Sequence, residues 1–198
     1  MNTRQIDIIV IGLGNIGLGF LRILGRKADH LRARYGLHFR VTGAADSKGA
    51  ALDPDGLDLA RVIRLKEEHH SVAAYPDRGR PGMAPQDVVE RTNAEVLCEA
   101  SPVNLQDGEP GLSCIRQALG KNMHVVTPNK GPLVLAYSEL TSLAAEREVQ
   151  LLFCGTVAGG LPAINIGRRD LAGATIHRIQ ALPNLTTSLI LELMAQGK

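Results

Sequence analysis

The hydrophobic positions of this chain fall into short continuous runs that alternate with segments of helical periodicity. The first run, residues 6–11, reads IDIIVI, which is typical of a strand buried on both faces of a parallel sheet. Strands are also expected at residues 39–45, 96–99, 124–126 and 150–153. Apolar residues between them recur at helical spacing, starting with Ile16, Phe20, Ile23 and Leu24. This alternation predicts an α/β fold with a Rossmann-type doubly wound parallel sheet.

Two stretches depart from that alternation. Residues 47–82 are polar and rich in Gly and Pro, and we expect only a short helix there, at 57–65. After Pro162 we expect one strand at 176–182 and one helix at 186–195, which cannot cover each other's apolar faces well. We therefore expect residues 1–162 to form one domain and residues 163–198 to begin a second domain that is cut off.

Composition narrows the classes of partner. The chain has 198 residues, of which 44% are hydrophobic and 21% charged, as in ordinary soluble domains. A net charge of +2 and an aromatic content of 3% argue against nucleic acid and anionic membranes as partners. The cysteines Cys98, Cys114 and Cys154 match no metal-ligand spacing, and the N-terminus lacks the order of a signal peptide. We expect a cytoplasmic protein without a bound metal.

A glycine-rich motif follows the first expected strand directly. Residues 12–17 read GLGNIG, a GxGxxG pattern between a strand and a helix, which is the context that dinucleotide binding requires. Gly12 would permit the tight turn, Gly14 would let the backbone approach a pyrophosphate, and Gly17 would let the helix pack on its strand. The start of the helix, with Asn15 and Ile16, would offer N–H groups to the phosphates. The motif predicts a site for NAD or NADP.

A carboxylate ends the second expected strand. Asp46 could accept hydrogen bonds from the adenosine ribose, although it lies 29 residues after Gly17 and the usual interval is about 20. A simple strand-end cap is the alternative interpretation. Ser47 and Lys48 follow directly, and because a lysine there could meet a 2′-phosphate, the pattern leaves the choice between NAD and NADP open.

Several segments together resemble homoserine dehydrogenase. They are the glycine turn, the AADS after the second strand, NMHVVTPNKGPLVLAYS at 122–138, TVAGGLP at 156–162 and ALPNLTTSLILELM at 181–194. The likeness extends over nearly the whole chain, and the VVTPNK and TVAGGLP segments are fairly specific to that family. The resemblance implies oxidation of L-homoserine to L-aspartate 4-semialdehyde with NAD or NADP, and the reverse reduction.

The same resemblance implies roles for three more residues. Ser101 would lie near the nicotinamide ribose, and Asn129 and Lys130 match the family's Asn-Lys pair. Lys130 would be the catalytic residue, because hydride transfer to an aldehyde builds negative charge on oxygen that an ammonium stabilises. The expected partners are the small-molecule substrate and a second copy of the chain.

Two positions depart from the family pattern. In some relatives the backbone carbonyls at the positions of Val157, Gly159 and Leu161 hold a monovalent cation. Cys154 stands where relatives usually carry a glutamate, so no metal is expected here. Leu185 replaces a glycine of the family's Asn-Gly-Thr segment. These departures leave two alternatives open: a non-catalytic dinucleotide-binding module, or another semialdehyde or amino-acid dehydrogenase. We also expect these 198 residues alone not to turn over homoserine.

Overall fold

The computed structural model of the chain describes residues 3–157, 159–180 and 185–197, the last stretch partly as backbone alone. The chain divides into two compact units, Met1–Phe153 and Cys154–Lys198. The first unit contains the sheet and the core.

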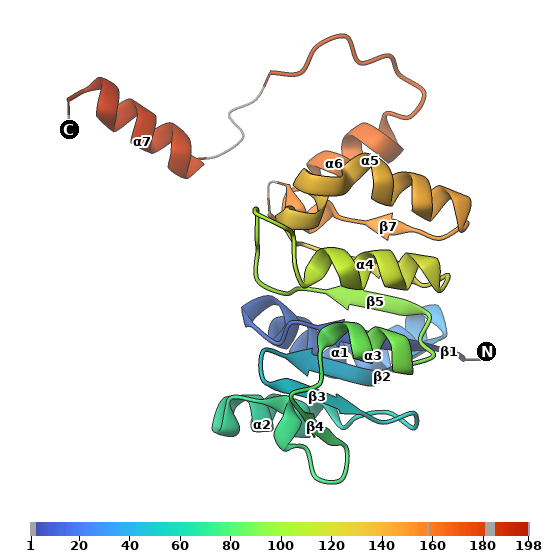
Figure 1. Cartoon of the computed structure of the whole chain (residues 1–198). Coiled ribbons are helices and arrows are strands. Elements are labelled where there is room, and N and C mark those ends of the chain that lie inside the picture. Colours follow the sequence, from blue (N-terminus) through green and yellow to red (C-terminus); the bar gives the residue numbers. More distant parts are fainter. Residues whose placement is uncertain (1–2, 158, 181–184, 198) are drawn as a thin grey trace. The chain divides into compact units, whose positions relative to one another are not determined.

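A seven-stranded sheet forms the first unit, in the order β4-β3-β2-β1-β5-β6-β7 (Figure 1). The strands that pair in parallel are β1 (Arg4–Ile11), β2 (Leu37–Asp46), β5 (Val96–Glu99), β6 (His124–Val126) and β7 (Leu151–Leu152). β1 lies between β2 and β5, so the direction in which the chain adds strands reverses at β1. The predicted doubly wound α/β fold is confirmed.

Helices cover both faces of this sheet. On one face α1 (Asn15–Tyr35) contacts α2 (Leu59–His69), and α2 contacts the short 3₁₀ helix η1 (Val72–Ala74). On the other face, nearer the viewer in Figure 1, α3 (Pro85–Arg91) contacts α4 (Gly111–Gly120), which contacts α5 (Lys130–Glu146). The helical periodicity that begins at Ile16 corresponds to α1, and the short helix expected at 57–65 corresponds to α2, which begins and ends a few residues later.

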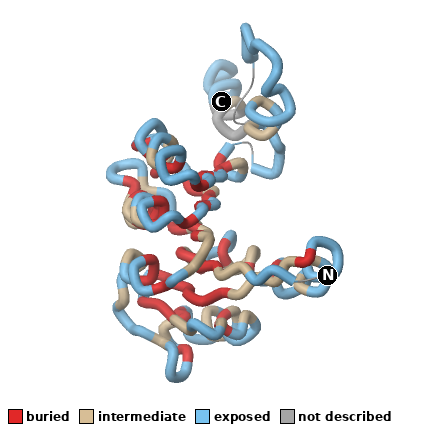
Figure 2. The backbone as a smooth tube through the Cα atoms, turned by 90° about the vertical axis from the view of Figure 1, so that its right-hand side faces the viewer, coloured by how far each residue is buried: buried red, intermediate tan, exposed pale blue. Residues whose placement is uncertain are grey.

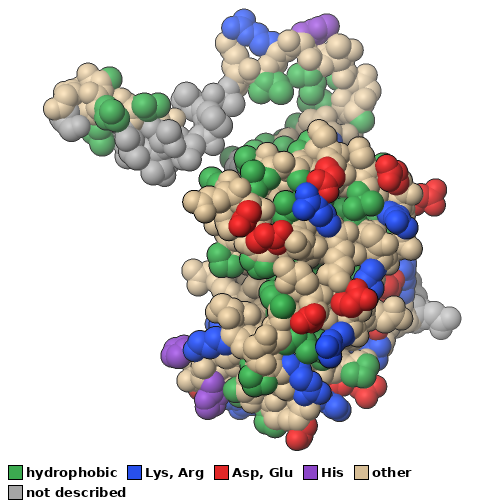
Figure 3. Space-filling view, viewed as in Figure 1, with side chains coloured by type: hydrophobic (Ala, Val, Ile, Leu, Met, Phe, Trp, Pro, Cys, Tyr) green, Lys and Arg blue, Asp and Glu red, His purple; other side chains and the backbone are tan. Residues whose placement is uncertain are grey.

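The core follows from the continuous apolar run of β1. Residues 8–11 are at most 1% exposed, because β1 has neighbours on both edges and helices on both faces. From α1, the side chains of Leu21 and Leu24 pack on the same cluster. Figure 2 shows the buried residues concentrated along the strands and the inner sides of the helices. On the face in Figure 3, basic and acidic side chains share the surface.

Two short strands within residues 47–82 are absent from the sequence prediction. β3 (Gly49–Leu52) pairs antiparallel with β2, and β4 (Gly79–Pro81) pairs antiparallel with β3. Gly49 has φ +145°, and a Cβ there would lie 2.4 Å from the Arg80 carbonyl oxygen. The Gly- and Pro-rich composition that suggested an irregular segment thus permits two strands to approach closely at the sheet edge.

The regular elements among the described residues of the second unit are all helical. They are η2 (Cys154–Thr156), α6 (Ala163–Asn165), the π-helical turn η3 (Ile166–Asp170) and α7 (Leu185–Ala195). The helix expected at 186–195 is therefore confirmed. The strand expected at 176–182 is wrong over residues 176–180, which pair with no described strand, and its last two residues lie outside the described chain. β-branched residues there do not form a strand without a partner edge.

None of the helices described is long and apolar enough to cross a membrane.

Candidate functional site

A cleft of about 630 Å³ opens at the carboxyl ends of β1, β2 and β5. Ligands of open α/β sheets bind at such a point, where the strand order reverses. Seven of the residues predicted from sequence line this one cleft: Gly12, Gly14, Asn15, Ile16, Asp46, Ser47 and Ser101. The structure thus brings together residues from three separate segments.

Two glycines of the motif are required by the fold itself. Gly12 has φ +93°, and a Cβ there would lie 2.3 Å from the Ala100 carbonyl oxygen. A Cβ on Gly17 would lie 2.0 Å from the Gly12 carbonyl oxygen, because the first turn of α1 packs directly on the end of β1. Any larger residue at either position would separate these backbones.

Gly14 differs from both, because no part of the described protein occupies the space beside it. A Cβ on Gly14 would have no heavy atom within 4 Å, and Gly14 is exposed on the cleft wall. It is the N-cap of α1, where no described side chain forms a cap and the first turn holds no acidic residue. The helix start, with the exposed Asn15 and Ile16, therefore presents N–H groups and the positive dipole end to the cleft.

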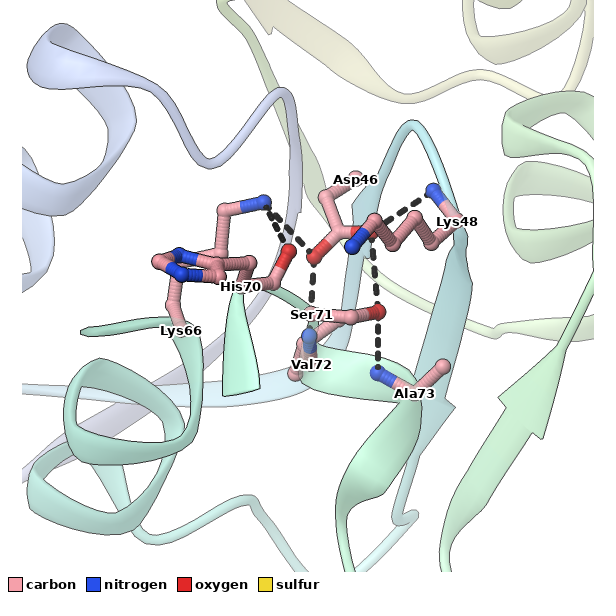
Figure 4. A network of polar contacts seen from close by, with 7 residues as sticks. All are labelled: Asp46, Lys48, Lys66, His70, Ser71, Val72 and Ala73. Atoms are coloured by element: carbon pink, nitrogen blue, oxygen red, sulfur yellow. Dashed lines mark hydrogen bonds and ion pairs between the residues drawn. The ribbon is translucent and has the colours of Figure 1, made fainter. Parts of the chain in front are cut away.

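Asp46 holds the β2 end of the cleft together through four hydrogen bonds (Figure 4). Its Oδ1 accepts from the Lys48 N–H at 2.8 Å and from the Ser71 hydroxyl at 3.1 Å. Its Oδ2 accepts from the Val72 N–H at 2.8 Å and from Lys66 Nζ at 3.1 Å. The Asp46 side chain is only 3% exposed, and Lys66 also donates to the His70 carbonyl oxygen.

This network limits what Asp46 can do for a ligand. A carboxylate has about four lone-pair sites, and four donors of the chain already occupy them. A direct hydrogen bond from a ribose hydroxyl would have to displace one of these donors. Lys66 also lines the cleft, and the sequence analysis did not predict it. Nothing in the Gly- and Pro-rich segment indicated that the Lys66 side chain would contact Asp46.

A second buried carboxylate lies at the end of β5. Glu99 is 0% exposed and accepts from the Ser101 N–H at 2.7 Å, from the Ser101 hydroxyl and from the Thr127 hydroxyl at 2.9 Å. The side-chain amide of Asn129 approaches Glu99 Oε1 at 3.5 Å and donates to the Ser101 hydroxyl and carbonyl oxygens, each at 3.3 Å. Sequence reasoning also missed Glu99, although carboxyl ends of neighbouring parallel strands meet at one edge.

The predicted Asn-Lys pair divides between the interior and the surface. Asn129 is 2% exposed, and its Oδ1 accepts from the Gly131 N–H at 3.1 Å as the N-cap of α5. Lys130 is the first residue of α5 and is exposed, and it is not among the residues that line the cleft. The structure therefore links Asn129 to Ser101 and leaves the Lys130 side chain at the surface.

The thiols of Cys98 and Cys114 have raised pKa values. Burial raises the pKa of Cys98 to about 12. Burial, with smaller contributions from the carboxylates of Glu99 and Glu109, raises the pKa of Cys114 to about 12. Both thiols are therefore protonated at neutral pH. Separately, no group of three or more His, Cys, Asp or Glu side chains among the described residues could hold a metal ion.

A sequence profile of the family described as Glutamate/Leucine/Phenylalanine/Valine dehydrogenase matches residues 2–105, just over half of the chain. This region covers β1 to β5 and includes the glycine turn, Asp46 and Ser101.

Homoserine dehydrogenases match over a greater length. The chain is 40% identical to the "Homoserine dehydrogenase" of Methanocaldococcus jannaschii over 95% of this chain and 55% of the relative. It is 29% identical to the "NAD(+)-dependent homoserine dehydrogenase" of Pseudomonas canavaninivorans over 98% of this chain and 55% of the relative. The chain thus spans about half the length of the curated relatives it matches.

A solved structure agrees with these matches. A hyperthermophilic archaeal homoserine dehydrogenase in complex with NADPH superimposes with a TM-score of 0.82 and 29% identity, covering 98% of this chain and 58% of that one. The chain therefore belongs to the dehydrogenase family whose profile it matches, and over nearly its whole length it is similar in sequence and fold to homoserine dehydrogenases.

Proposed function

We propose that this chain binds NAD or NADP in the cleft at the ends of β1, β2 and β5 and serves the oxidation of L-homoserine to L-aspartate 4-semialdehyde. The observation that carries the proposal is Gly14. The fold has room for a side chain at this position and Gly14 lines the cleft, so a glycine here would serve the close approach of a ligand to the backbone. A pyrophosphate on the uncapped start of α1 is that ligand.

We assign the two halves of the dinucleotide to opposite sides of Gly14. Asp46 and Ser47 lie at the β2 side, which we assign to the adenosine half. Ser101 lies at the β5 side with Asn129 behind it, and we assign this side to the nicotinamide half. One solved relative is a complex with NADPH and one curated relative is NAD(+)-dependent, which supports both forms as candidates.

The bound nicotinamide would supply hydride transfer to or from the substrate carbon. The residues of this chain would bind, orient and stabilise charge. Asn129 is fixed by hydrogen bonds to Ser101 and by its cap on α5, so it sets the position at which Lys130 begins that helix. We assign to the Lys130 ammonium the stabilisation of negative charge on the reacting oxygen.

Groups beyond this cleft would complete the enzyme. Residues 163–198 would begin the catalytic and dimerisation domain, since the curated relatives are almost twice as long as the matched region. Near-attack positioning of homoserine needs groups that clamp both ends of the substrate. We propose a cytoplasmic homodimer in which that domain supplies them, and little turnover by residues 1–198 alone.

Titration calorimetry with NADH and NADPH tests the proposal. The unmodified chain should bind at least one of them, and Gly14→Val should weaken that binding by at least about tenfold, because a branched side chain would fill the place of the pyrophosphate. Gly19→Val is the matched control, since a Cβ on Gly19 in the same helix also has no heavy atom within 4 Å, and Gly19 does not line the cleft. Equal affinities in the two variants would contradict the proposed site.

A further inference from the structure

The hydroxyl of Ser101 has a fixed polarity at the cleft wall. Its one proton is donated to Glu99, and one of its lone pairs accepts from the amide of Asn129 at 3.3 Å. A serine hydroxyl has one donor and two acceptor positions, so one acceptor position is left. Ser101 lines the cleft, so a ligand that reaches this remaining position can only donate a hydrogen bond to it.

Glu99 determines this polarity. Glu99 accepts hydrogen bonds from Ser101, Thr127 and Asn129. An acceptor at this place requires the Asn129 amide to direct its NH₂ toward Glu99 and its oxygen toward the Gly131 N–H. The Ser101 hydroxyl then directs its proton at Glu99 Oε1 and accepts a hydrogen bond from the Asn129 amide.

The start of α4 packs closely against this network. A Cβ on Gly111, at the start of α4, would lie 2.9 Å from Asn129 Nδ2 and 3.1 Å from Glu99 Oε1. Glu99 itself is 0% exposed, and a buried carboxylate needs hydrogen-bond donors from the protein. The ends of β5 and β6 and the start of α4 therefore enclose Glu99 and its donors.

We propose that Glu99 is a positioning residue, which acts through Ser101 and Asn129 to make the β5 side of the cleft an acceptor of one hydrogen bond. The group bound there is then a hydrogen-bond donor, such as a hydroxyl or an amide N–H, and an anionic group is disfavoured. This inference rests on the proposed function, because it assigns that donor to the nicotinamide half of the cofactor. It adds a recognition element that does not touch the ligand directly.

The test compares a whole dinucleotide with its adenosine half. Calorimetry should show that Glu99→Gln weakens NADH or NADPH by about tenfold while the affinity for ADP stays within about twofold, because a glutamine amide disturbs the Ser101 side alone. Glu95→Gln is the matched control, as Glu95 precedes the same strand and pairs with Arg4 at the surface. It should change neither affinity.

Ser101→Ala gives the same test if Glu99→Gln does not fold, since it removes only the hydroxyl and should also weaken the dinucleotide selectively. Equal losses for ADP and the dinucleotide would show that Glu99 is merely structural and would overturn the proposal, as would unchanged affinity for both. Failure of the unmodified chain to bind either ligand would overturn the proposed function, and this inference with it.

Discussion

Two carboxylates lie at the ends of parallel strands on either side of the glycine turn, and each accepts from several donors of the chain. Asp46 at the end of β2 takes one of its hydrogen bonds from an ammonium, that of Lys66, and it lines the cleft. Glu99 at the end of β5 takes all its bonds from neutral groups, and it lies wholly behind the cleft wall.

The hydrogen bonds of Asp46 and those of Glu99 hold different parts of the molecule in place. The Asp46 bonds tie β2 to the end of α2 and the start of η1, which are parts of the same excursion of the chain. The Glu99 bonds join the ends of β5 and β6 and orient two residues assigned to cofactor binding. We infer that Asp46 mainly stabilises the fold of the adenosine side, whereas Glu99 mainly sets hydrogen-bond polarity at the nicotinamide side.

Removal of Asp46 should have the largest effect on stability. Asp46→Ala would leave four donors without their acceptor, one of them the Lys66 ammonium, and should lower the free energy of unfolding by about 3–5 kcal/mol. Urea denaturation measures this loss. Asp29→Ala, at an exposed position of α1, should change stability by less than about 0.5 kcal/mol. A similar small loss for Asp46→Ala would show that its network contributes little.

Removal of Lys66 should cost less than removal of Asp46. Lys66→Met keeps the apolar stem and leaves Asp46 with three donors, so we expect a loss of about 1–2 kcal/mol by the same urea measurement. Lys27→Met, on the exposed side of α1, is the matched control. A loss as great as that of Asp46→Ala would mean that the ion pair alone carries the network.

The free energy of unfolding should fall slightly at alkaline pH, because of the thiols of Cys98 and Cys114. The pKa of Cys98 and of Cys114 is about 12 in the folded chain, above the ordinary value of 9.0. The unfolded chain therefore releases these protons first, and stability falls as the pH rises above about 8, by less than about 1 kcal/mol between pH 8 and pH 9. Urea denaturation at both pH values should show a flatter dependence when both cysteines are replaced by Ala. An unchanged dependence would remove the thiols as its source.

The sequence predicted those parts of the fold whose signal is local. The continuous run of β1 and the helical stripe of α1 indicated the sheet and its first helix, and the glycine turn between them indicated the cleft. β3 and β4 escaped prediction because strands of three or four residues depend on pairing across a long excursion. Lys66 and Glu99 escaped because their roles depend on which side chains meet at the strand ends.

A structure of the chain crystallised with NADPH would show where the dinucleotide binds. We expect the pyrophosphate at the start of α1 beside Gly14, within hydrogen-bond distance of backbone N–H groups of residues 14–16. We also expect a hydroxyl or amide group of the nicotinamide half to donate a hydrogen bond to the Ser101 hydroxyl. A dinucleotide bound away from the carboxyl ends of β1, β2 and β5, or a phosphate against Ser101, would contradict the proposed binding mode.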